Sequence, residues 1–405
     1  MQELSYVRED GHSNTRSCGG SQPKRGALAC HLRRSLRIGD LAVVAVILTV
    51  VGAAAPPTAA QTPSFLGLGQ MPGVAPTGGT YAFAISGDGS TIMGYADACA
   101  DGGTTCAAPS AVRAYRWTVA GGYEVLTLPG STAYLGAGAV SFDDSVVVGE
   151  DPRGTWPPGF RWTTRQGLKG LPLAVASAIT PDGKMVAGLD KWWKTTGETG
   201  MFGAFPGQPN RTEAKGLTGS AEAPIAAGDA IKGRDAGGLA PHAFRWTPAG
   251  GLQDLGVTSG TESLGIAVSG DGAVVVGEAT DRAFLWRAFR WTATTGMVDI
   301  GTLGGPMSGA FAANRDGSVV VGTSLANDFS DSNRFFRWTP KTGMQDLLPV
   351  LQAAGVHNAD SWVTLETIVG VSADGTVMVG YGKGPRTHVF PFGRYEPFRI
   401  VLPVP

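Results

Sequence analysis

Acidic residues are one group in this sequence whose side chains could carry out chemistry. Five isolated glutamates could supply the acid and the base of a glycosidase if the fold brought two of them together. These glutamates are Glu124, Glu198, Glu262, Glu278 and Glu366. Their spacing follows no pattern, so we assign no catalytic residue. A secreted polysaccharide hydrolase or lyase is the alternative function that they leave open.

Histidine and cysteine patterns give no support to metal chemistry. His242, His357 and His388 do not have the spacing of metal ligands, and no Cys or His cluster supplies a complete set. We therefore predict no metal site and no cofactor. Cys99 and Cys106 lie seven residues apart in a polar, glycine-rich segment, which in an exported chain favours one local disulfide.

Trp192 and Trp193 are the strongest candidates for a ligand site. They stand between Lys191 and Lys194, in a segment that we interpret as a polar insertion interrupting a repeat. Exposed indoles could stack on sugar rings, whereas packing against the fold is the structural alternative. We predict that, if the protein has a small-ligand site, both tryptophans belong to it.

Two motifs alternate along the chain and imply the elements that position these residues. One is Phe-Arg-Trp-Thr, and the other is Asp-Gly, two variable residues, an apolar pair and Gly. The first occurs at Phe160, Phe244, Phe289 and Phe336, with a variant at Tyr115, and the second at Asp88, Asp182, Asp271, Asp316 and Asp374, with degenerate copies at Asp143 and Ala227–Gly233. A period of about 48 residues is typical of propeller blades with four strands each.

These motifs predict an all-β fold, a seven-bladed β-propeller of four-stranded antiparallel blades, over residues 61–405. Residues 65–69 resemble the last strand of a repeat, and residues 398–401 resemble the strand before it. We expect these two unpaired segments to meet in one blade and close the ring.

Charged residues recur nine positions apart in three of the repeats. A four-residue loop ending in Gly lies midway between them, so we predict that the two charges stand directly opposite each other in a hairpin. The predicted structural ion pairs are Arg245–Asp254, Arg290–Asp299 and Arg337–Asp346. The aromatic residues of the motif should then pack on the next blade.

Residues 1–60 are typical of a signal peptide. Arg33, Arg34 and Arg37 precede the apolar run Leu41–Gly52, and small residues follow up to Ala60. This run is too short to span a bilayer but matches a secretory segment. We expect cleavage near Ala60/Gln61, a periplasmic or extracellular location, and no stable membrane span in the mature chain.

Composition excludes nucleic acid as a partner. The chain has a net charge of −1 and only 16% charged residues, which is no footprint for a polyanion. Because only fold-forming residues recur, we predict a monomeric, non-enzymatic binding or scaffold module. Its partner would be an extracellular glycan or a surface protein.

The segment Pro241–Thr247, followed by Gly251–Gly256, resembles the HAF-repeat family of bacterial extracellular proteins, named for its His-Ala-Phe triplet. The run Asp299–Gly305 fits the same pattern, and the likeness extends over residues 65–401. The resemblance implies secretion and a repeat architecture. It carries no catalytic residues.

Overall fold

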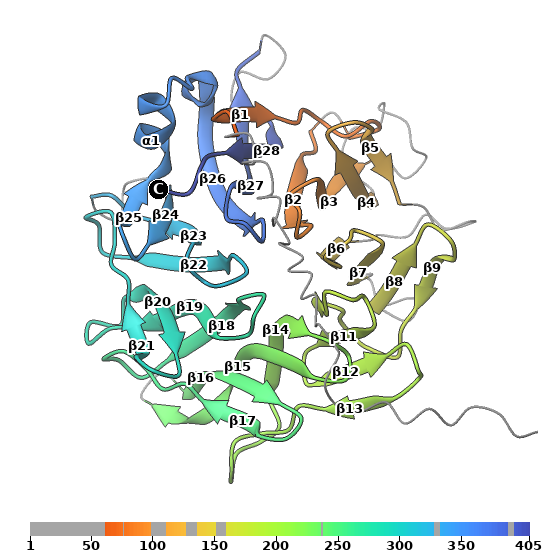
Figure 1. Cartoon of the computed structure of the whole chain (residues 1–405), viewed down its shortest axis with the longest axis vertical. Helices are drawn as coiled ribbons and strands as arrows, with labels where there is room; N and C mark the ends of the chain where they lie inside the picture. Colours follow the sequence, from red (N-terminus) through yellow and green to blue (C-terminus); the bar gives the residue numbers. More distant parts are fainter. Residues whose placement is uncertain are drawn as a thin grey trace, which may run out of the picture. The chain divides into compact units, whose positions relative to one another are not determined.

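The computed structural model describes residues 61–75, 77–98, 111–126, 136–150, 159–235, 238–327, 333–387 and 393–405. Their strands form seven sheets of four antiparallel strands each. The sheets stand as blades around a common axis (Figure 1), which confirms the predicted seven-bladed propeller. Residues 1–60, Cys99 and Cys106 lie outside the described residues, so the signal peptide and the disulfide stay predictions.

Strands of blades 1 to 4 follow the chain from the axis outward. Blade 1 contains β2 (Thr80–Ile85), β3 (Thr91–Ala98), β4 (Ala111–Thr118) and β5 (Gly122–Val125). Blade 2 contains β6 (Gly136–Val140), β7 (Val146–Glu150), β8 (Gly159–Thr163) and β9 (Gly167–Gly170). Blade 3 contains β10 (Ala178–Ile179), β11 (Met185–Gly188), β12 (Lys191–Lys194) and β13 (Thr199–Met201). Blade 4 contains β14 (Thr212–Gly219), β15 (Pro224–Asp235), β16 (Gly238–Thr247) and β17 (Gly251–Asp254).

Blades 5 and 6 repeat this order, and blade 7 departs from it. Blade 5 contains β18 (Ser263–Val268), β19 (Val274–Thr280), β20 (Trp286–Thr292) and β21 (Gly296–Asp299). Blade 6 contains β22 (Ser308–Ala313), β23 (Val320–Ser324), β24 (Arg334–Thr339) and β25 (Gly343–Asp346). Blade 7 contains β26 (Trp362–Val371), β27 (Val377–Pro385), β28 (Tyr395–Val401) and, as its outermost strand, the N-terminal β1 (Ser64–Gly67).

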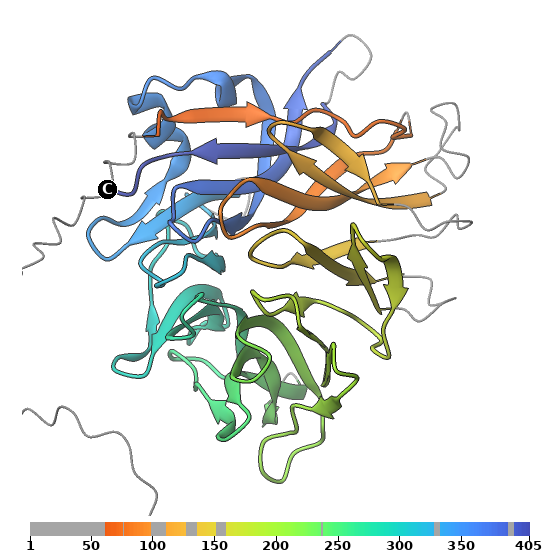
Figure 2. The same ribbon diagram turned by 45° about the vertical axis from the view of Figure 1, so that its right-hand side comes forward.

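Blade 7 therefore joins the two ends of the described chain. Phe65 pairs with Ile400 and Gly67 with Phe398, so the predicted closure is confirmed. Figure 2 shows β1 lying beside β28. Phe65 is 3% exposed, and its ring stacks on that of Phe398 with centroids 5.3 Å apart.

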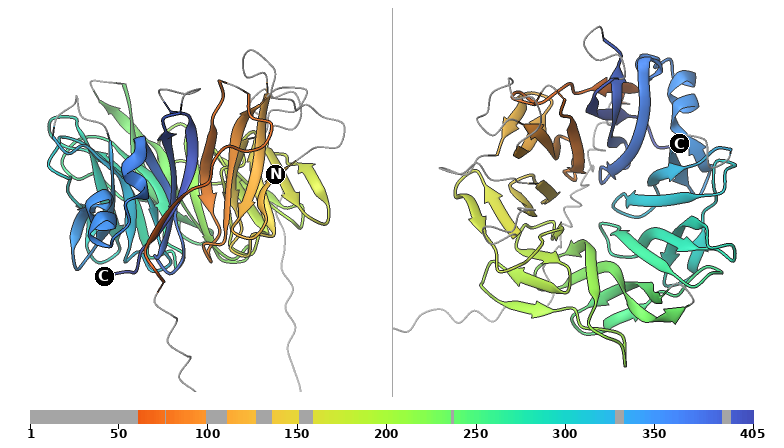
Figure 3. Two further views of the ribbon diagram at one scale, coloured as in Figure 1. Left: turned by 90° about the horizontal axis from the view of Figure 1, so that it is seen from above. Right: turned by 180° about the vertical axis from the view of Figure 1, so that it is seen from behind.

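The only helices of the described residues lie between blades 6 and 7. They are α1 (Leu347–Ala353) and the short 3-10 helix η1 (Asn358–Ser361). Asp346 caps α1 by accepting a hydrogen bond from the backbone N–H of Leu348 at 3.0 Å. The helix α1 lies on the outer rim of the ring (Figure 3). Its side chains Leu347 and Leu351 are buried against the core. No helix of the described chain is long and apolar enough to cross a membrane.

Seven separate hydrophobic cores stabilise the ring, one at each junction between neighbouring blades. The first aromatic residue of the Phe-Arg-Trp-Thr motif is fully buried in every blade that keeps it. These residues are Tyr115, Phe160, Phe244, Phe289 and Phe336, with Phe398 at the same place in blade 7. This aromatic residue packs between two blades as predicted, but against the preceding blade rather than the next one: Phe289 of blade 5 shares a core with Ala227 and Ala243 of blade 4.

The predicted register of the outer hairpins is wrong by one residue. Thr247 pairs with Gly251, so the hairpin loop has three residues rather than four. Gly251 belongs to the ladder with a φ of 62°, and Thr247 accepts a hydrogen bond from the N–H of Gly250. The residue opposite Arg245 is consequently Gln253. The same shift places Val298 opposite Arg290 and Gln345 opposite Arg337.

Asp254, Asp299 and Asp346 pair with other side chains. In each blade the partner stands two residues before the first aromatic residue of the motif. Nδ1 of His242 lies 2.9 Å from Asp254, Arg287 lies 3.2 Å from Asp299, and Arg334 lies 3.2 Å from Asp346. Burial alone would raise the pKa of Asp254, but hydrogen bonds from His242, Gly256 and Lys232 lower it well below its ordinary value. His242 thus has a structural role within β16, where it pairs with Asp254.

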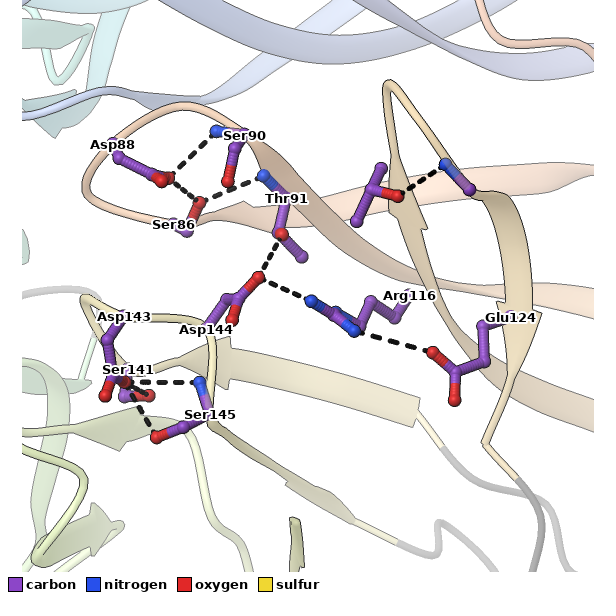
Figure 4. Close-up of polar contacts among 12 residues, drawn as sticks. Ser86, Asp88, Ser90, Thr91, Arg116, Glu124, Ser141, Asp143, Asp144 and Ser145 are labelled. Carbon is purple, nitrogen blue, oxygen red and sulfur yellow. Dashed lines mark hydrogen bonds and ion pairs between the residues drawn. The ribbon is translucent and has the colours of Figure 1, made fainter. Parts of the chain in front are cut away.

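The motif arginine instead connects one blade to the next. Arg245 donates to the carbonyl of Gly272 at 2.9 Å, and Arg290 donates to that of Gly317 at 3.0 Å. Both acceptors are the glycines of the Asp-Gly turn in the following blade, so the two sequence motifs bind each other at these junctions, whereas Arg337 donates to the carbonyl of Pro403 at 2.8 Å. In blade 2 an aspartate, Asp144, replaces this glycine and accepts from Arg116 at 2.6 Å (Figure 4).

Replacing Arg290 with Met is expected to lower the free energy of unfolding by about 1–3 kcal/mol. The substitution keeps most of the stem but removes a charge-assisted hydrogen bond and leaves the Gly317 carbonyl without it. Urea denaturation measures the loss. The matched control is Arg282→Met, at an exposed position. Equal stabilities of the two variants would contradict a role for the blade-to-blade bond.

Candidate functional site

A central channel lined by the innermost strand of every blade is the main concave feature. In six of these strands a β-bulge turns one residue toward the axis, and Ser177 takes the same place before β10. The resulting bulge ring consists of Phe83, Gly138, Ser177, Lys215, Ile266, Phe311 and Val369, all of which line the channel.

The bulge explains why the Asp-Gly motif ends in glycine. The bulge moves a backbone carbonyl of the inner strand toward the second strand. There it takes the space that the Cβ of any residue larger than glycine would need at the last position of the motif. At Gly277, a Cβ would collide with the carbonyl oxygen of Leu264, and at Gly322 with that of Gly309. The same clash occurs at all seven equivalent positions, the others being Gly94, Gly149, Gly188, Gly228 and Gly380.

The channel contains two chambers. We name the two ends of the ring by their connections: the turn face carries the Asp-Gly turns, and the loop face carries the links between blades. The loop-side chamber has a volume of about 560 Å³ and reaches the bulge ring, while the turn-side chamber has about 420 Å³. Lys215 is the one charged residue lining the first, and Arg315 is the one lining the second, among the described residues.

An aromatic platform formed by Tyr81, Phe83, Tyr95, Tyr381 and Tyr395 lies at the loop end of the channel. Tyr81 is its centre, with ring centroids 5.2 Å from Tyr95, 5.3 Å from Tyr381 and 5.4 Å from Tyr395. Phe83 stacks on Tyr95 at 5.1 Å and is 39% exposed. Phe83 and Tyr381 also line the loop-side chamber, so the platform continues into the channel.

Charged side chains surround this platform. Burial raises the pKa of Tyr81, and the neighbouring Asp97 raises it further, so its phenol stays neutral. Burial also raises the pKa of Tyr381, and the negative charge of Glu366 raises it further. Nζ of Lys383 lies 5.3 Å from the ring centroid of Tyr395. The platform thus combines apolar ring faces with hydroxyl, carboxylate and ammonium groups.

Lys215 lies on another part of the channel wall, in a cluster where carboxylates balance its positive charge. Its ammonium lies 2.6 Å from Asp229 and 3.6 Å from Glu213. Burial opposes its charge, but these carboxylates outweigh burial and raise its pKa. Burial raises the pKa of Glu278 as well. Lys215 is therefore held by its own neighbours rather than poised for an incoming anion.

Trp192 and Trp193 lie in a regular strand, which corrects their interpretation as an insertion. In β12, Lys191-Trp192-Trp193-Lys194 occupies the place of Phe-Arg-Trp-Thr, with Trp193 opposite Val186. Both indoles are half-buried, and they pack against the cores of two different blade junctions. Trp192 stands where other blades have the motif arginine, and blade 4, which it faces, has also lost the Asp-Gly turn.

The candidate acids of the sequence are not brought together in either chamber. No carboxylate of the described residues lines these two chambers. Likewise, the described residues contain no group of three or more metal-ligating side chains. Sequence reasoning missed the aromatic platform because its four tyrosines stand outside the repeated motifs, in two pairs that lie about 300 residues apart in the chain.

Comparisons with known proteins place the fold. No protein-family model and no curated protein matches the chain. The structure is similar to oligogalacturonate lyase from Vibrio parahaemolyticus, with 10% identity, a TM-score of 0.50, and 85% of this chain and 98% of that chain covered. It is also similar to virginiamycin B lyase from Staphylococcus aureus, with 13% identity, a TM-score of 0.48, and coverages of 84% and 98%.

A third similar structure is TolB from Acinetobacter baumannii, with 13% identity and a TM-score of 0.40. It is matched over 64% of this chain and 63% of its own length. At such identities the likeness shows the fold alone. The class that fold and channel define is a seven-bladed propeller, and membership of the HAF-repeat family stays a prediction.

Proposed function

We propose that this chain is an exported, non-enzymatic binding module that holds an extracellular glycan on the aromatic platform at the loop face. The observation that carries the proposal is the contiguous, partly exposed set of five rings beside the channel. Sugar rings present C–H faces that pack on aromatic faces, while a few polar groups fix their orientation. Asp97, Glu366 and Lys383 supply such groups at the platform.

This proposal puts the ligand at the tyrosines rather than at Trp192 and Trp193. The two indoles pack between blades, whereas the platform borders a chamber with space for a ligand. Export enters the proposal through the signal-peptide pattern of residues 1–60.

Replacing Tyr381 with Ala is expected to weaken glycan binding about tenfold or more, because one stacking face and its buried area are lost. Tyr381→Phe keeps the ring and should retain most of the affinity. A glycan array with the purified protein identifies the ligand, and isothermal titration calorimetry with that ligand compares the variants.

Phe284→Ala is the matched control, since Phe284 is an exposed aromatic residue, 63% accessible, on a turn of blade 5. Its loss should leave glycan affinity unchanged. An array without a hit, or equal losses for Tyr381→Ala and Phe284→Ala, would contradict the proposed site. Shortening of an oligosaccharide by the protein would support the alternative of a polysaccharide-cleaving enzyme.

A further inference from the structure

The channel wall between the two chambers is aliphatic. One residue of each inner strand, two positions beyond the bulge, forms this aliphatic ring, and most members line both chambers. The ring consists of Ile85, Val140, Ile179, Leu217, Val268, Ala313 and Val371. Phe311 and Ile266 continue the apolar lining toward the loop face, and Phe142, 45% exposed, continues it toward the turn face.

We propose that this channel binds the single alkyl chain of an anionic amphiphile, with its carboxylate at Arg315 and its tail passing through the aliphatic ring. A ring of apolar side chains around a channel favours a flexible hydrocarbon chain over a rigid polar ligand. This site goes beyond the proposed glycan function, because its ligand and its head-group residue are different.

Charge complementarity places the head group at the turn face. Arg315 is exposed, lines the turn-side chamber, and forms no ion pair within the described residues. The carboxylates Asp271 and Asp316 also lie near this position, and each acts to raise the pKa of Arg290. At the opposite end Lys215 is already neutralised by Asp229, and Glu213 and Glu278 would repel an anion.

The spacing of the rings sets the length of the tail. Phe311 and Ala313 lie two positions apart in β22 and Arg315 lies in the turn that follows, so Arg315 and the bulge ring are at most about 13 Å apart along the chain. An extended hydrocarbon chain advances about 1.3 Å per carbon, given the bond length and tetrahedral angle, so about ten carbons cover this distance. A twelve-carbon chain reaches from Arg315 into the loop-side chamber.

Titration calorimetry with dodecanoate, below its micelle concentration, tests the proposal. We expect dodecanoate to bind at least about 30-fold more tightly than octanoate, because each buried methylene strengthens binding up to about fourfold. Dodecyltrimethylammonium, which has the same tail and the opposite charge, should bind at least about tenfold more weakly than dodecanoate. Equal affinities for the two head groups, or no effect of chain length, would overturn the proposal.

Two variants locate the site. Arg315→Glu should reduce dodecanoate affinity about tenfold or more, whereas Arg282→Glu, the same charge change at another exposed position, should leave it unchanged. Ala313→Trp should abolish binding by filling the aliphatic ring. If this variant does not fold, Arg315→Glu still decides, and an equal effect of both charge reversals refutes the site. Arg315→Glu should leave glycan binding unaltered, so the two proposals fail separately.

Discussion

Deleting residues 395–405 is expected to abolish the cooperative unfolding transition. This deletion removes β28, an interior strand of blade 7 that pairs with both β27 and β1. Phe398 and Ile400 are fully buried in it, and truncating one such side chain alone costs about 2–5 kcal/mol. Their sum, with the lost strand pairing, approaches the whole stability of about 5–15 kcal/mol of a typical domain.

Differential scanning calorimetry and near-UV circular dichroism measure this effect. The control is deletion of Val404 and Pro405 alone, since both are exposed and follow the last strand. This shorter deletion should shift the melting temperature by only a few degrees. A sharp transition near the wild-type temperature after the longer deletion would show that the ring does not depend on its closing blade.

Gly277→Ala is expected to destabilise the protein by about 3 kcal/mol or more. The added methyl group would occupy the position of the Leu264 carbonyl oxygen, so either the bulge of β18 or its pairing with β19 must shift. Without that clash, alanine would be favoured over glycine in a strand by about 0.5–1 kcal/mol, because glycine loses more entropy on folding. The sign of the change therefore tests the bulge geometry.

Gly233→Ala provides the matched control for this prediction. Gly233 also lies in a second strand, β15, but a Cβ there meets no atom within 4 Å. Its replacement should be neutral or slightly stabilising. Chemical denaturation of both variants measures the difference. A Gly277→Ala variant as stable as Gly233→Ala would mean that the inner strand adapts without cost.

The repeated residues predict the blades well because they fulfil the same local requirement seven times. A turn with Asp and Gly, an apolar run and a terminal glycine determine one hairpin and its position against the axis. Closure was predictable for the same reason: Phe65 and Phe398 are recognisable as members of a repeat although they stand at opposite ends of the chain.

The partner of the motif arginine was not predictable from one repeat. Arg290 and Gly317 belong to different blades, and their contact exists only when the ring is assembled. The one-residue error in the predicted register has a local cause, at a single glycine. A glycine with positive φ fits the last position of a loop and the first position of a strand equally well, and Gly251 is in the second situation.

The candidate site was the least predictable part. Tyr81 and Tyr381 become neighbours only because blade 7 closes against blade 1. Trp192 and Trp193 attracted attention because they break the pattern. A substitution within a strand and an insertion into a loop change the motif in the same way when only the sequence is read.

The pairing of β1 with β28 also determines how the protein responds to mechanical force. Ser64 faces Val401, so the chain enters and leaves this pair of strands at the same end, on the turn face. Hydrogen bonds of antiparallel strands run across the strands. Tension between the two termini would therefore load these bonds one at a time and peel the closing strand away, as in unzipping. A tether through a single terminus does not load the β1–β28 pair in this way, and it leaves the loop face pointing away from the point of attachment.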